Sequence, residues 1–322
     1  MILKLFKNQR PASQGLLILV ALALWSFAFI KSYDESGVIS DSLYQWLIHF
    51  IEGIPFIKPG AAVVLIIVQA IMINNIIIEN RLISSRTYVP SLIYIVLMSS
   101  MPEFLKFSPG LIGNFLFILM LNRLFKTYRD DHSNSKIFDA GLYLGLASTV
   151  DFSFILMLVF GWLSLAILRS FSWRESLVLA VGALVPYSFI FTYYYVIGDL
   201  QNLAGHFVLF DSIRVYQNIS LPVQYFPLLI AFVGLILLAS KTVFLEWRIG
   251  VVKVKKLMST LTLFSGLVLL FSSLDISFCI ALAIPLCVYL SNYFINTQKK
   301  LVAEGSFLLL LISIVYLHIV TL

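Results

Sequence analysis

The sequence predicts an all-α fold, a polytopic membrane helix bundle with about eleven transmembrane helices. Composition is the first observation behind this prediction. The 322 residues are 60% hydrophobic and 12% charged, with a mean hydropathy of +0.97. A soluble chain is about 45–50% apolar and about 25% charged. The second observation is that the apolar residues gather in long stretches, and about 20 such residues in a helix cross a bilayer.

Eleven apolar stretches give the expected spans in chain order. No long polar linker divides them, so we expect a single integral membrane domain over residues 1–322. Several stretches are short, which predicts some half-length or kinked helices. Only Asp151 separates the fifth stretch from the sixth. If the two formed one span, every later segment would lie on the opposite side of the membrane. The stretches are residues 16–30, 61–78, 88–101, 111–125, 138–150, 152–168, 176–197, 222–240, 257–271, 276–294 and 305–322.

The placement of charge predicts the orientation. With the N-terminus in the cytoplasm, 18 of the 22 Lys and Arg residues fall in cytoplasmic segments and nine of the 16 acids fall outside. This is the positive-inside pattern. The net charge of +6 is therefore spread beside membrane spans and does not indicate nucleic acid. We expect a multi-pass membrane protein, in contact with membrane lipids, with a cytoplasmic N-terminus and its C-terminus on the outer side.

The first long outer segment, residues 31–60, contains apolar residues at helical spacing. Because they recur every three or four residues, they predict an amphipathic helix that lies on the outer leaflet. These residues are Leu43, Trp46, Leu47, Phe50 and Ile51. A second long outer segment, residues 198–221, is a candidate for another interfacial helix.

Few motifs in the chain carry chemistry. The four histidines, at positions 49, 132, 206 and 318, are scattered over different segments, so no metal site is predicted. Gly141 and Gly145 form a GxxxG pattern, which favours close packing of two helices and names no function. Cys279 and Cys287 both fall inside an apolar stretch and are expected to be core residues.

The outer charges are the candidate functional residues. A charge close to the hydrocarbon is costly and tends to face a cavity or a partner. Carboxylates at Asp34, Glu35 and Glu103 could therefore line one pocket on the outer face, as candidate catalytic residues. A lipid phosphate that approaches from the outer leaflet would need a cation. The outer cations proposed for this role are Lys58, Lys106 and Arg214.

An acid just after the first span and a second acid between the third and fourth spans resemble the start of a GT-C glycosyltransferase. Residues 139–147 and 169–175 are similar to the middle of that class, so residues 1–200 form a GT-C-like core and residues 201–322 add C-terminal helices. The resemblance implies glycosyl transfer from a polyprenyl-phosphate lipid at the periplasmic face. It would make Asp34 or Glu35 the general base and would place a divalent cation, as cofactor, on Glu103.

The whole chain also resembles an uncharacterised family of bacterial inner-membrane proteins of about this length. Five short stretches carry this likeness. It implies a location in the bacterial inner membrane, with the C-terminus in the periplasm, and no particular chemistry. They are residues 8–11, 88–91, 102–104, 138–141 and 172–175.

Three functions stay open at this point. The first is the glycosyltransferase. The second is a non-catalytic subunit that scaffolds an assembly or export complex of the cell envelope, with other membrane proteins as partners. The third is a transporter or lipid flippase, which would need a site near the middle of the membrane.

The topology predicts that Glu35→Cys and Asn134→Cys react with a membrane-impermeant thiol reagent from opposite sides of the membrane. Glu35 is assigned to the outer face and Asn134 to the inner face, so each variant should label in only one orientation of sealed vesicles. Labelling of both variants from the same side would contradict the topology.

Overall fold

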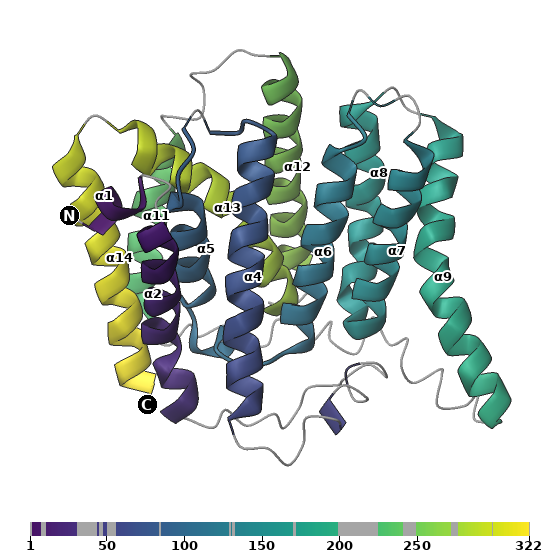
Figure 1. Ribbon diagram of the computed structural model, residues 1–322, viewed down its shortest axis with the longest axis horizontal. Helices are drawn as coiled ribbons and strands as arrows, with labels where there is room; N and C mark the ends of the chain where they lie inside the picture. The colour runs from purple at the N-terminus through teal and green to yellow at the C-terminus, as the bar shows by residue number, and fades with distance from the viewer. Residues whose placement is uncertain are drawn as a thin grey trace.

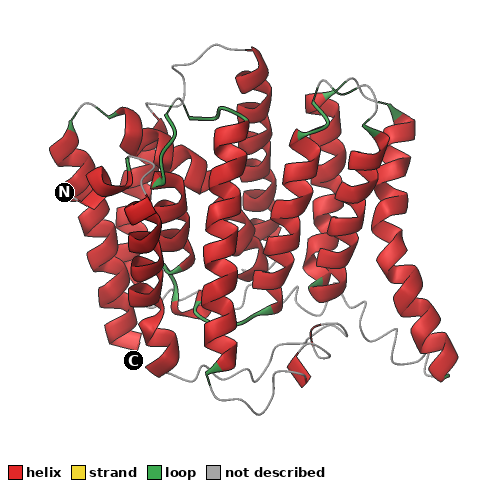
Figure 2. Ribbon diagram, in the orientation of Figure 1, coloured by secondary structure: helices red, strands yellow, loops and turns green. Residues whose placement is uncertain are grey.

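The computed structural model is helical throughout the part of the chain that it describes, apart from turns and loops (Figure 2). The all-α prediction is confirmed. The described residues are 2–7, 11–30, 44, 48–49, 56–83, 85–128, 130, 133–169, 172–198, 225–240, 249–271, 276–297 and 299–321. Among them, eleven helices have ten residues or more.

The helices follow the order of the predicted apolar stretches. Short elements precede or interrupt them: α1 (Ile2–Phe6) and two 3₁₀ turns, η1 (Pro102–Phe104) and η2 (Phe152–Leu156). The longer helices are α2 (Pro11–Ile30), α4 (Ile57–Glu79), α5 (Val89–Met98), α6 (Pro109–Phe125), α7 (Asn134–Val150), α8 (Met157–Leu168), α9 (Trp173–Ile197), α11 (Phe226–Ser240), α12 (Ile249–Phe271), α13 (Ile276–Asn296) and α14 (Lys300–Thr321).

The long helices lie side by side and alternate in direction (Figure 1). α2 and α5 end, and α4 and α6 begin, at the lower end of the bundle in that view, where the C-terminus also lies. We call this the Glu103 end. α12 begins at the opposite end, which we call the Lys253 end.

Among the helices that the structure describes, four are long and apolar enough to cross a membrane, by length and composition. Their spanning parts are Ala12–Ile30, Ile57–Glu79, Trp173–Ile197 and Leu301–Thr321. Shorter apolar helices, such as Val89–Met98 and Pro109–Phe125, pack among them. The protein is therefore an integral membrane protein built as a helix bundle.

Local sequence signals set several helix boundaries. Ser108 precedes Pro109, and its hydroxyl accepts a hydrogen bond from the backbone N–H of Leu111 at 3.3 Å, which caps α6. Asp151 is extended and accepts from the N–H of Ser153 at 3.1 Å, so it ends α7 and caps η2. The chain reverses there, which makes the fifth and sixth stretches two separate helices.

The short helix α5 is the centre of the hydrophobic core. All ten of its residues are buried, and it contacts α13, α4 and α2. Its first turn is held by the N–H of Tyr88, which donates to the carbonyl of Phe6 in α1 at 2.9 Å. Its last turn leads into Ser99 and Ser100, which are also buried. Both ends of this helix therefore lie within the protein.

The GxxxG pattern makes the closest helix contact. A Cβ atom added to Gly141 would lie 2.2 Å from the backbone oxygen of Leu179, and one added to Gly145 would lie 2.3 Å from that of Ala183. Gly182 of α9 meets the backbone of α7 in the same way, with its added Cβ 2.5 Å from the oxygen of Phe138. The packing role predicted for the pattern is confirmed, and its partner is α9.

Gly141→Ala should destabilise the protein because the methyl group meets backbone that cannot move without separating α7 from α9. We expect a loss of about 1–3 kcal/mol, as for other overpacked sites. The measurement is the thermal unfolding midpoint in detergent. Gly266→Ala in α12 is the control, since its added Cβ meets nothing within 4 Å. A Gly141→Ala midpoint at or above that of the control would contradict the packing role.

Candidate functional site

Three of the six predicted site residues are described, and all three belong to the Glu103 end. Glu103 is the second residue of η1, Lys106 follows that turn, and Lys58 lies in the first turn of α4. Each is half-buried. Glu103 and Lys106, both within the described ranges, form no ion pair with each other. The other three predicted residues, Asp34, Glu35 and Arg214, lie outside the described residues.

The Glu103 carboxylate is held by a residue far away in the chain. Its Oε1 accepts a hydrogen bond of 2.7 Å from the hydroxyl of Tyr225, just before α11. Its Oε2 is buried and has no hydrogen-bond partner among the described residues. Around it, η1 packs against α13 and α14. A shielded carboxylate oxygen without a donor is unfavourable unless a ligand or water completes it.

A histidine that the sequence did not single out lies beside this carboxylate. His318 is 1% exposed, and its Nε2 lies 2.8 Å from the backbone oxygen of Ser99. The same serine accepts a 3.0 Å hydrogen bond on its Oγ from the indole N–H of Trp25. Helix α14, which carries His318, packs against η1, which carries Glu103. We call Trp25, Ser99, Glu103, Tyr225 and His318 the Glu103 cluster.

The Glu103 cluster joins segments that local sequence patterns cannot connect. His318 is 219 positions from Ser99, and Tyr225 is 122 positions from Glu103. The sequence signal for His318 is an ionisable ring in the apolar second half of the last helix. An intramembrane ionisable residue is by default a candidate functional residue.

The first outer segment also touches this region. Tyr44 is 3% exposed, and its hydroxyl donates to the carbonyl of Phe107 at 2.6 Å. The two rings stack with centroids 6.3 Å apart. Most of the predicted interfacial helix, residues 43–51, lies outside the described residues, and so does the second long outer segment. Tyr44 nevertheless ties the first segment to the turn that follows Glu103.

A second polar cluster lies in the interior, between α4, α5 and α6. The hydroxyl of Tyr94 donates to Oε1 of Gln69 at 2.5 Å and accepts from Nδ2 of Asn114 at 2.8 Å. Gln69 in turn donates to the carbonyl of Leu111 at 2.8 Å. All three side chains are fully buried. Hydrogen bonds of this kind hold helices together in a membrane.

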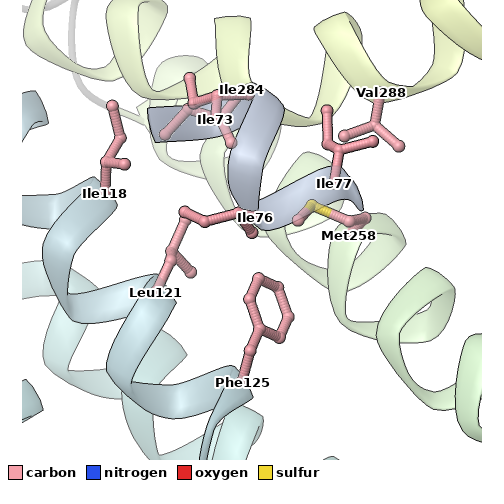
Figure 3. Close-up of a pocket in the computed structure, with 9 residues that line it drawn as sticks. All are labelled: Ile73, Ile76, Ile77, Ile118, Leu121, Phe125, Met258, Ile284 and Val288. Carbon is pink, nitrogen blue, oxygen red and sulfur yellow. The ribbon is translucent and has the colours of Figure 1, made fainter. Parts of the chain in front are cut away.

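The pocket in Figure 3 is apolar and small. Residues of α4, α6, α12 and α13 line it, among them Ile73, Phe125, Met258 and Ile284. Its volume is about 10 Å³, which is about the room that one water needs. Neither a sugar nor a lipid chain fits there, and none of its lining residues belongs to the Glu103 cluster.

The opposite end carries most of the described positive charge. Arg169 pairs with Glu175 at 3.2 Å and also donates to Ser133 and to the carbonyl of Thr127. Lys253 donates to the carbonyl of Leu168 at 3.0 Å and lies 5.2 Å from the ring centre of Tyr128. These contacts tie the loops of the Lys253 end to α12.

The described residues do not fit the divalent cation expected on Glu103. Across the described ranges, no three His, Cys, Asp or Glu side chains gather in a group that could hold a metal ion. Glu103 offers one unpaired oxygen, whereas a Ca²⁺ site typically takes about six to eight oxygen ligands. No step of the proposed chemistry therefore passes through a metal.

Comparisons with known proteins give no family for this chain. No family model matches it, and neither the curated proteins nor the solved structures contain a match.

Tyr94→Phe should destabilise the bundle because it removes the hydroxyl that links Gln69 to Asn114. We expect a loss of about 0.6 kcal/mol, the average measured for hydrogen bonds between membrane helices, and at most about 1.7 kcal/mol. The measurement is the unfolding midpoint in detergent, with Tyr143→Phe in α7 as the control for the same chemical change. Equal midpoints for the two variants would show that the interior cluster adds no stability.

Proposed function

We propose that the protein is a GT-C-like glycosyltransferase that uses a polyprenyl-phosphate-linked donor at the outer face of the membrane. The carrying observation is Glu103, a carboxylate held by Tyr225 with its second oxygen shielded and unpaired. Burying such a group costs stability. Retaining one at the end of an apolar bundle is typical of a site that acts on a ligand.

The distribution of charge supports an outer location for this site. The described lysines and arginines concentrate at the Lys253 end, where Arg123, Lys126, Arg169 and Lys253 lie. Positive charge favours the cytoplasmic side. The proposal therefore places the Glu103 end, with the C-terminus, in the periplasm of a bacterium and the N-terminus in the cytoplasm.

The first predicted acid, Asp34 or Glu35, lies in the segment between Ile30 and Tyr44. Ile30 and Tyr44 both belong to the Glu103 end. Trp25 of α2 bonds to Ser99 at 3.0 Å, and α2 ends five residues later at Ile30. Asp34 follows Ile30 by four residues, a length of chain that spans at most about 14 Å. Tyr44 then binds Phe107. Both anchors support the proposal that Asp34 or Glu35 belongs to the Glu103 site.

The proposed reaction is an inverting displacement. A base takes the proton of the acceptor hydroxyl, whose oxygen then forms a bond to the anomeric carbon of the donor sugar. The bond from that carbon to the phosphate oxygen breaks, and polyprenyl phosphate leaves with the electron pair. Lys106, Lys58 or Arg214 would stabilise the negative charge on the leaving phosphate.

A second candidate function, a scaffold for other membrane proteins, is favoured by helix α9. Only 22% of its spanning window is buried. Figure 1 shows α9 diverging from its neighbours toward the Glu103 end, where Phe189 and Tyr195 are 72% and 66% exposed. This apolar flank suits another membrane helix as well as it suits lipid. A transporter would need a polar site in the middle of the membrane. The interior cluster around Tyr94 is the described feature most similar to such a site, but its polar atoms largely bind one another.

Glu103→Gln and Asp34→Asn should each abolish transfer without lowering the amount of protein in the membrane. Each change removes the negative charge and keeps the side-chain shape, and we expect turnover to fall by about 100-fold or more. The assay uses proteoliposomes with radiolabelled polyprenyl-phosphate glucose, mannose and arabinose as donors and a membrane extract as the acceptor. It measures the polyprenyl phosphate that is released.

Glu79→Gln is the matched control. Glu79 lies at the far end of α4, where its 3.9 Å contact with Lys126 is exposed, and such pairs contribute little. It should keep wild-type turnover. Wild-type turnover in both Glu103→Gln and Asp34→Asn would remove the proposed site. A wild-type protein that consumes none of the three donors would contradict the glycosyltransferase and leave the scaffold as the better account.

A further inference from the structure

The hydrogen bond between His318 and Ser99 determines which ring nitrogen carries the proton. The partner of Nε2 is a backbone carbonyl oxygen, 2.8 Å away, and a carbonyl can only accept. Nε2 must therefore be protonated. In the neutral ring Nδ1 is then a free base, and it is buried without a hydrogen-bond partner among the described residues.

Two unpaired acceptors consequently lie in one buried cluster. They are Nδ1 of His318 in α14 and Oε2 of Glu103 in η1, two elements that pack against each other. The Tyr225 hydroxyl and the Trp25 indole N–H are already engaged, because the first bonds to Oε1 of Glu103 and the second bonds to Ser99. A group that completes either acceptor must be a hydrogen-bond donor, and a substrate hydroxyl has this chemistry.

The position of the ring is fixed from two sides. Phe27 stacks on it with ring centroids 5.3 Å apart, and Ser99 holds Nε2. His318 lies three residues before the last residue of α14, which is about 5 Å along the helix axis. A ring that is fixed, buried and one turn from the end of the bundle is well placed to receive a proton from a ligand bound at that end.

We infer that His318 is the catalytic base of the proposed transfer and that Glu103 stabilises the imidazolium formed when His318 accepts the proton. Nδ1 takes the proton of the acceptor hydroxyl as its oxygen bonds to the anomeric carbon and polyprenyl phosphate departs. The proton then passes from Nδ1 to the departing phosphate or to water, which restores the neutral ring. The inference rests on the proposed function. It assigns the base to His318, and the carboxylate of Asp34 or Glu35 then acts through its negative charge in the same site.

The competing explanation is purely structural. A buried histidine that donates to the last turn of a helix satisfies a carbonyl that would otherwise be unpaired. Two substitutions separate the explanations. A glutamine side chain can place its N–H₂ where Nε2 lies and keep the bond to Ser99, but it has no basic nitrogen. An asparagine side chain is too short to keep that bond and also lacks the base.

The test measures kcat and the KM for the donor in proteoliposomes of the full chain, with the three polyprenyl-phosphate sugars named above. His318→Gln should lower kcat by about 100- to 10,000-fold, the usual contribution of a general base, with KM and the unfolding midpoint close to wild type. His318→Asn should lose kcat and also unfold at lower temperature. The kcat of His318→Gln distinguishes the two explanations, because a purely structural role predicts that this variant keeps wild-type kcat.

The possible results distinguish a failure of the role of His318 from a failure of the glycosyltransferase function. Wild-type kcat in His318→Gln, with Glu103→Gln inactive, would overturn the role of His318 and leave the proposed function standing. Absence of turnover in the wild-type protein would overturn the proposed function and this inference together.

Discussion

The short helix α5 imposes the constraint on which the arrangement of polar groups depends. Its ten residues are all buried, and a helix leaves its last carbonyls without partners inside itself. A bilayer offers no water to satisfy them, so the protein must do so. Ser99, just past the last turn, therefore receives His318 on its carbonyl and Trp25 on its hydroxyl. Satisfying the end of α5 is what brings α2 and α14 to the turn that carries Glu103.

The rest of the bundle surrounds this helix with tighter and looser parts. On one side, α4 and α6 are tied to α5 through Gln69, Tyr94 and Asn114. Farther out, α7 and α9 touch backbone to backbone at Gly141 and Gly145. Beyond Pro186, α9 has few buried residues. The rigid part therefore positions the Glu103 cluster, while α9 offers its exposed face to lipid or to another helix.

The sequence alone predicts the helices well because a membrane span needs a long apolar stretch. The fifth and sixth stretches end and begin at Val150 and Phe152, the bounds found in α7 and η2. The predicted helix boundaries are wrong where polar residues belong to a helix. α12 begins at Ile249, eight residues before the predicted stretch, because Lys253, Lys255 and Lys256 lie in its first turns. The sequence also predicts Glu103 as a candidate site residue. It does not predict His318 or Tyr225, since their contacts join residues more than a hundred positions apart.

The most direct test of the central claim is an experimental structure of the full chain in lipid, at a resolution that shows side chains. The account predicts a bound molecule between Oε2 of Glu103 and Nδ1 of His318. It also predicts the carboxylate of Asp34 or Glu35 within about 6 Å of Glu103, a distance that one bridging water spans. The opposite result is a structure in which those two atoms bond to separate protein groups and both acids lie far from Glu103. It would show that the Glu103 end holds no site.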